Sequence, residues 1–113
     1  MLHAVDASTT PSTPVADLAR LTAAAMDAVV AGHGHVVGSS HVIFPNGAIT
    51  LVLILAESHL SIHTWPEEDL IAIDLFSCGA IDAPRVIGEL VSLLRLERVA
   101  VSQVPRGIQA ARG

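Results

Sequence analysis

The sequence predicts an α/β (α+β) two-layer sandwich, with a mostly antiparallel sheet and two helices on one of its faces. Apolar residues make up 51% of the chain and charged residues only 15%, which is typical of a packed core. Several short segments alternate in polarity, whereas only two segments have helical periodicity. Because 113 residues suit one domain, we expect a single domain over residues 1–113.

The expected element order is β-α-β-β-β-β-α-β. A short first strand, residues 2–5, precedes a loop rich in Ser, Thr and Pro. Thr13 is expected to cap the first helix with Pro14 at its first position, and Gly32 and Gly34 are expected to end it. Apolar spacing predicts one face for this helix: Val15, Leu18, Leu21, Thr22, Ala25 and Val29.

The middle of the chain predicts four consecutive strands. Residues 35–44 and 49–56 flank Pro45-Asn46-Gly47, a turn signal typical of a hairpin. The run 49–56 is apolar on both faces, as expected of a central strand. Residues 58–64 and 70–77 alternate in polarity on either side of a polar turn.

A second helix and a last strand complete the expected fold. Asp82 is the expected N-cap and Pro84 lies in the first turn. Four residues form the expected buried stripe: Val86, Leu90, Val91 and Leu94. Residues 99–104 are the last strand and residues 105–113 a tail. Hairpins dominate this order, so we expect the sheet to be mostly antiparallel.

Composition excludes several classes of partner. The net charge is −5, there is no lysine, and the six arginines form no cluster. Nucleic acids and anionic membranes are therefore not expected partners.

No apolar run approaches the roughly 20 residues that span a bilayer, and no signal peptide is visible. Cys78 is the only cysteine, so we expect a reduced, cytoplasmic location. The apolar excess favours an oligomer.

Residues 57–67 form the most informative segment of the chain. A serine, Ser58, lies between an acid and a histidine, and alternation then places His59, Ser61 and His63 on one face of a strand. The lack of lysine excludes the resting Schiff base of a pyridoxal enzyme. Amine chemistry here would need another carbonyl, and a serine can provide one if the backbone breaks before it.

Three other interpretations of these residues are weighed. His59 and His63 as metal ligands would lie about 13 Å apart on a strand, so no metal site is expected. A hydrolase triad of Ser58, a histidine and Asp74 lacks the G-x-S-x-G elbow. The third interpretation is a packed domain with histidines at its edge, which covers His3, His33, His35 and His41.

The motif Leu-Ala-Glu-Ser-His-Leu-Ser-Ile-His-Thr-Trp-Pro-Glu at residues 55–67 is followed by Asp-Leu-Phe-Ser-Cys-Gly at residues 74–79. Together they strongly resemble the prokaryotic S-adenosylmethionine decarboxylase proenzymes, a pyruvoyl-dependent family. The resemblance implies self-cleavage between Glu57 and Ser58, giving chains 1–57 and 58–113. It also implies that Ser58 becomes a covalent pyruvoyl cofactor, which forms a Schiff base with the substrate amine without pyridoxal phosphate or metal.

The resemblance also assigns roles to other residues. His63 matches the base of self-processing and Cys78 matches the proton donor of catalysis. Thr50 stands where the family has a serine that helps processing, and its extra methyl group predicts slower cleavage. The positions expected to bind substrate are Phe44, Trp65 and Glu67.

One departure from the family leaves the substrate open. Glu68-Asp69-Leu70 replaces an aromatic-glycine-aromatic stretch and adds two negative charges. The first hypothesis is decarboxylation of S-adenosylmethionine for spermidine biosynthesis. The second is the same chemistry on a basic amino acid, ornithine or arginine. The third is a non-catalytic regulatory paralogue. The expected partners are a small-molecule amine and a second copy of the chain, in a homodimer of cleaved protomers.

Overall fold

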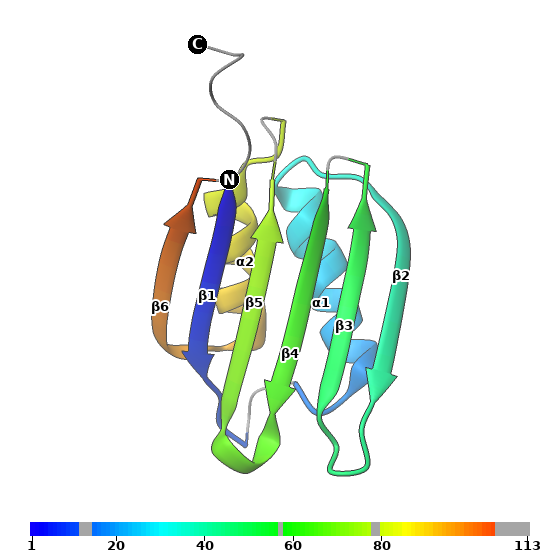
Figure 1. Ribbon diagram of the computed structural model, residues 1–113, viewed down its shortest axis with the longest axis vertical. Helices are drawn as coiled ribbons and strands as arrows, with labels where there is room; N and C mark the ends of the chain where they lie inside the picture. The colour runs from blue at the N-terminus through cyan, green and yellow to red at the C-terminus, as the bar shows by residue number, and fades with distance from the viewer. Residues whose placement is uncertain (12–14, 57, 78–79, 106–113) are drawn as a thin grey trace.

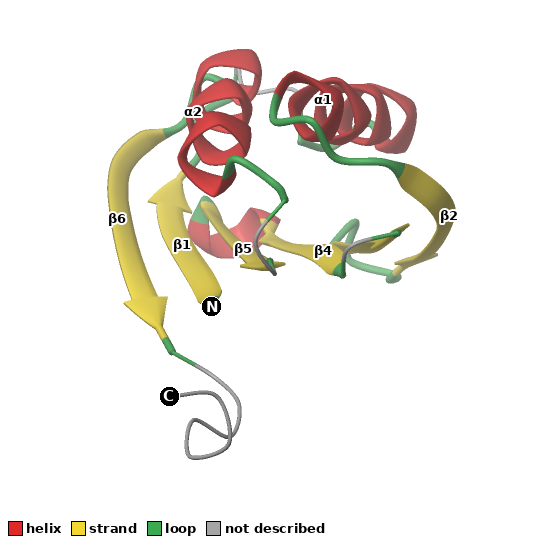
Figure 2. Cartoon of the chain, turned by 90° about the horizontal axis from the view of Figure 1, so that it is seen from above, coloured by secondary structure: helices red, strands yellow, loops and turns green. Residues whose placement is uncertain are grey.

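The computed structural model describes residues 1–11, 15–56, 58–77 and 80–105, and within these ranges it has one six-stranded sheet and two α-helices (Figure 1). Both helices lie side by side on the same face of the sheet (Figure 2). The predicted fold class and element order are therefore confirmed. The elements are β1 Leu2–Ser8, α1 Leu18–Ala31, β2 Val36–Ile43, β3 Ile49–Leu55, β4 His59–Trp65, the 3₁₀ turn η1 Pro66–Glu68, β5 Leu70–Phe76, α2 Ala83–Leu94 and β6 Glu97–Val104.

The strand order across the sheet is β2-β3-β4-β5-β1-β6, and every neighbouring pair is antiparallel. Strands β2 to β5 follow one another as hairpins, whereas β1 inserts between β5 and β6. The placement of β1 makes β5 an interior strand, and β4 is interior because it lies between β3 and β5. The segment that carries the candidate residues is thus paired on both edges and held rigidly.

The core lies between the sheet and the helices. Every second residue of β4 and β5 is buried against the helices, with Leu60 and Leu75 fully inaccessible. From the helices, Leu21, Val29 and Leu90 complete this layer. The helices approach closely because Gly32 lacks a side chain: a Cβ at this position would lie only 2.3 Å from Val86 Cγ2.

The predicted start of the first helix is wrong. The helix α1 begins at Leu18, where the side chain of Asp17 accepts hydrogen bonds from the N–H groups of Ala19 (2.9 Å) and Arg20 (3.4 Å). These bonds satisfy two of the free N–H groups of the first turn, so Asp17 is the N-cap. Thr13 and Pro14, the predicted cap and first position, lie outside the described residues.

Other helix boundaries agree with the sequence. Gly32 is the C-cap of α1, and Asp82 caps α2 by accepting from the N–H of Arg85 at 3.2 Å. Pro84 lies in the first turn of α2, as predicted. No helix in the described part of the chain is long and apolar enough to cross a membrane.

The bounds of β2 to β5 agree with the predictions to within one residue at each end, whereas β1 and β6 differ more. The strand β1 continues to Ser8 because it pairs with β5 along its whole length, and β6 begins at Glu97. His3 was expected at the edge of the domain but is only 7% exposed, because it lies with Val5 and Ala7 on the face of β1 that the helices cover. The other three histidines of that group are exposed: His33, His35 and His41.

Candidate active site

The predicted site residues of β4 lie on the sheet face opposite the helices. Leu60, Ile62 and Thr64 are buried toward the helices, so His59, Ser61 and His63 point to the other face. The predicted alternation is therefore confirmed. We call the face opposite the helices the open face, defined by Thr50, Ile54, His59, His63 and the residues aligned with them in the sheet.

Thr50 and His63 form a hydrogen-bonded pair on the open face. They are direct partners in the antiparallel register of β3 and β4, and Thr50 Oγ1 lies 2.6 Å from His63 Nδ1. Thr50 is β-branched and has few side-chain conformations, so the hydroxyl group is held in place by the strand itself. The pair fixes the orientation of the imidazole and leaves Nε2 as its other reactive nitrogen.

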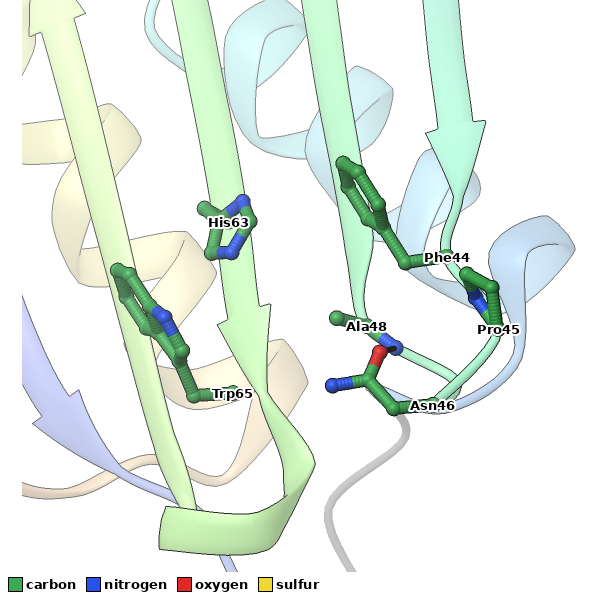
Figure 3. A pocket seen from close by; sticks show the side chains of 6 residues that line it. All are labelled: Phe44, Pro45, Asn46, Ala48, His63 and Trp65. Carbon is green, nitrogen blue, oxygen red and sulfur yellow. Dashed lines mark hydrogen bonds between the residues drawn. The ribbon is translucent and has the colours of Figure 1, made fainter.

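A pocket of about 420 Å³ opens beside this pair. Figure 3 shows His63 between Trp65 and Phe44, with ring centroids 4.3 Å and 6.0 Å from the imidazole. The lining residues are Phe44, Pro45, Asn46, Ala48, His63 and Trp65. The volume is within the range of small-molecule sites, and aromatic faces of this kind hold planar rings or cations.

The pocket forms where the β2–β3 hairpin and the β4–β5 hairpin separate, at the end of the β3–β4 ladder. The β3–β4 ladder ends at Thr50 and His63, and the buried Thr64 hydroxyl then accepts a hydrogen bond from the N–H of Ile49 at 2.9 Å. Beyond that point the predicted turn folds back on itself, with the N–H of Phe44 donating to the Ala48 carbonyl at 2.8 Å. Gly47 takes a φ of +89°, which a glycine adopts without strain.

Glu67 lies at the rim of the pocket, in the turn between β4 and β5. Its carboxylate accepts a hydrogen bond from the side-chain amide of Asn46 in the facing turn. Glu68 and Asp69 follow and are exposed, and Asp69 has a φ of 53° at the end of η1. Negative charge therefore gathers beside the aromatic pocket, which suits a cationic ligand.

Ser58 lies at the opposite end of β4. Its carbonyl accepts from the N–H of Leu55 at 2.9 Å, in the turn between β3 and β4. His59 and His63 are about 13 Å apart along the strand, given roughly 3.3 Å per residue, and Ser58 is one residue farther away. One chain therefore brings together Phe44, Thr50, His63, Trp65 and Glu67 but keeps Ser58 apart from them. A Ser58–His63–Asp74 triad is likewise not assembled, because Asp74 is opposite Ser61.

Glu57 and Cys78, the predicted cleavage position and proton donor, lie outside the described residues. The structure describes the chain next to Cys78: Phe76 pairs with His59, and their rings stack with centroids 5.8 Å apart. Ser77 is buried, and its N–H donates to the carbonyl of Met1 at 3.0 Å. The strand β5, which leads to Cys78, thus ends beside the start of β4, at the Ser58 end of the sheet.

Fold and site define an α+β sandwich with an aromatic small-molecule pocket on its open face. A Bacillus cereus protein named S-adenosylmethionine decarboxylase proenzyme 2 is 40% identical over 75 residues, or 66% of this chain and 61% of that protein. A Methanococcus maripaludis S-adenosylmethionine decarboxylase proenzyme is 44% identical over 70 residues, or 61% of this chain and 57% of that protein. The matched part thus spans about three fifths of these relatives.

A solved structure and a family model extend the similarity to almost the whole chain. The crystal structure of the adenosylmethionine decarboxylase from Aquifex aeolicus has a TM-score of 0.80 and 28% identity, over 99% of this chain and 94% of the other. Residues 2–107 match the family model described as S-adenosylmethionine decarboxylase. The chain belongs to the S-adenosylmethionine decarboxylase family, which confirms the resemblance found in the sequence.

Proposed function

We propose that this chain is a proenzyme that cleaves itself and then decarboxylates S-adenosylmethionine, the step that supplies aminopropyl groups for spermidine. The observation that carries the proposal is the Thr50–His63 pair beside an aromatic pocket, with His63 on the strand that begins directly after Ser58. Family membership and the names of the relatives, which are proenzymes, support it. The reduced cytoplasm is the expected compartment, since the chain has a single cysteine.

Maturation would proceed through the chain's own residues. The Ser58 hydroxyl attacks the Glu57 carbonyl and converts the amide to an ester. Removal of the Ser58 α-proton, with His63 as the base, eliminates the Glu57 carboxylate and leaves an unsaturated residue at position 58. Addition of water then releases ammonia and leaves a pyruvoyl group. The pyruvoyl carbonyl would supply the electron sink for amine chemistry. Pyridoxal phosphate, the alternative electron sink, is held by a lysine, and this chain has no lysine.

The separation of Ser58 from His63 supports a homodimer with shared sites. Within one chain His63 cannot reach the Ser58 α-proton, because most of β4 lies between them. If two open faces pack on each other, sheets stack about 10 Å apart. A two-fold axis that lies between the two sheets and runs perpendicular to the strands would reverse the strand direction in the second copy. The Ser58 end of β4 in each chain would then lie against the His63 end of β4 in the other.

The open face has the composition that such a contact needs. Large apolar side chains are 40–52% exposed on it or at its rim: Val42, Phe44, Ile54, Trp65 and Leu70. A soluble domain rarely leaves such a surface uncovered. Cys78, which lies outside the described residues, keeps its proposed role of returning a proton to the product carbon.

Substrate binding would use the aromatic pocket. The adenine ring would stack against Phe44 and Trp65, and Glu67 would accept a hydrogen bond from the ribose or attract the sulfonium charge. The carboxylates of Glu67, Glu68 and Asp69 also suit ornithine or arginine, which is the second candidate. The third candidate, a regulatory paralogue, would need the pocket only for binding.

The identity of the substrate is tested by measuring release of carbon dioxide from S-adenosylmethionine, ornithine and arginine, each labelled at the carboxyl carbon. We expect saturable release from S-adenosylmethionine alone. Release only from ornithine or arginine would replace the first candidate with the second. No release from any of them would favour the regulatory paralogue.

Co-expression of two variants tests the shared site. Ser58→Ala leaves a chain that cannot be cleaved but still carries His63, and His63→Ala leaves a chain with Ser58 but no base. We expect the His63→Ala chain to stay intact alone and to be cleaved when paired with the Ser58→Ala chain. An intact His63→Ala chain in both cases would contradict the shared site.

A further inference from the structure

The side chain of Asn46 links the two turns at the rim of the aromatic pocket. Its Oδ1 accepts from the N–H of Ala48 at 3.0 Å, and its Nδ2 donates to Oε1 of Glu67, which is 21 residues away. The backbone N–H can only donate and an ionised carboxylate can only accept, so a single orientation of the amide satisfies both bonds. Asn46 therefore stabilises its own turn and at the same time binds the facing turn between β4 and β5.

The link matters because little else joins these turns. The β3–β4 ladder stops at Thr50 and His63, and no backbone hydrogen bond connects residues 44–48 with residues 65–69 in the described part of the chain. One pocket wall, Phe44, belongs to the β2–β3 hairpin, and the other, Trp65, belongs to the β4–β5 hairpin (Figure 3). The width of the pocket at its rim is thus set partly by the Asn46–Glu67 bond.

The same bond restrains the carboxylate. Glu67 is exposed in a short turn, where a free glutamate would sample many side-chain conformations. With Oε1 held by Asn46, the second oxygen, Oε2, has no hydrogen bond to any described residue and stays available. A carboxylate that is held before the ligand arrives binds it with a smaller loss of conformational freedom.

We propose that Asn46 is a positioning residue for substrate binding. It holds Glu67 so that Oε2 can accept a hydrogen bond from a nucleoside hydroxyl group, and it keeps the facing walls Phe44 and Trp65 at a fixed separation. This inference rests on the proposed function, because it takes the nucleoside part of S-adenosylmethionine as the ligand of the pocket.

A double-mutant cycle separates this role from simple turn formation. Asn46→Asp keeps an oxygen for the N–H of Ala48 but replaces the amide donor with a carboxylate that repels Glu67. Glu67→Gln keeps an acceptor for the amide of Asn46. Combining both substitutions reverses the pair, because the new glutamine can donate to the new aspartate.

Binding is measured through the fluorescence of Trp65, the only tryptophan of the chain, during titration of the cleaved protein with 5′-methylthioadenosine. This thioether nucleoside lacks the aliphatic α-amine of S-adenosylmethionine, so it cannot form a Schiff base with the pyruvoyl carbonyl. We expect Asn46→Asp to raise Kd about tenfold in the wild-type background and less than about twofold in the Glu67→Gln background. In turnover assays KM should rise similarly while kcat stays within about twofold.

The outcomes are distinct. An equal loss in both backgrounds would mean that Asn46 only shapes its turn, and an unchanged Kd for Asn46→Asp would mean that it does not position Glu67. Either result overturns this inference and leaves the proposed function intact. If the wild-type protein does not bind the nucleoside, the proposed function fails and the inference fails with it.

Discussion

Replacing Thr50 by valine should slow self-cleavage while leaving the fold intact. Valine has nearly the shape of threonine and suits a β-strand, so β3 keeps its packing. It removes the oxygen that lies 2.6 Å from His63 Nδ1. The half-buried imidazole then loses a partner that fixes its orientation, at a cost of about 1–3 kcal/mol. If this cost falls on the step in which His63 removes the α-proton, the rate falls by about 5- to 150-fold.

The assay is the time course of conversion of the full-length chain into fragments 1–57 and 58–113, followed by mass after denaturation. Thr50→Ser is the matched control, because it keeps the hydroxyl group and removes only the methyl group. We expect it to cleave at least as fast as the wild-type chain. Cleavage of Thr50→Val at the wild-type rate, with an unchanged denaturation midpoint, would refute the role assigned to the Thr50–His63 pair.

Two further predictions concern stability and are checked by the free energy of unfolding in urea. Thr64→Val should cost about 1–3 kcal/mol, because it leaves the buried N–H of Ile49 without its acceptor. Thr64→Ser is the control and should recover most of that loss. Asp17→Ala should cost about 1 kcal/mol through loss of the N-cap of α1, whereas Asp27→Ala, at an exposed position within the same helix, should change little. Equal effects of Asp17→Ala and Asp27→Ala would contradict the assigned cap.

The strands around the site could be predicted because local patterns determine them. Alternation at residues 58–64 requires one buried and one open face, and the structure buries Leu60 and Ile62 as expected. The hairpin at Pro45-Asn46-Gly47 follows from the need for a positive φ at Gly47. The second helix was also predictable, since Asp82 and Pro84 are signals of a helix start.

Features that depend on contacts between distant residues could not be predicted. The placement of β1 between β5 and β6 is set by pairing across the whole chain, and the helices cover the face of β1 that carries His3. The predicted cap of the first helix is Thr13, and the hydrogen bonds that make Asp17 the cap are visible only in three dimensions. In the sequence Asn46 is simply a turn residue, since its bond to Glu67 spans 21 positions.

The most important difference concerns the candidate site itself. The motif at residues 55–67 is contiguous in sequence, which suggests that its members act on one another. An extended strand instead puts Ser58 and His63 at opposite ends of the open face. The homodimer proposed above would bring Ser58 of one copy near His63 of the other, and the exposed apolar side chains of the open face are consistent with that proposal.

The intact mass of the purified protein under denaturing conditions tests the central claim most directly. The account predicts two chains, one ending at Glu57 and one starting at residue 58, with the second lighter by one ammonia than a chain that begins with serine. A single uncleaved species that persists on long incubation would contradict self-processing at Ser58. Two fragments with an unmodified serine at the new end would contradict pyruvoyl formation.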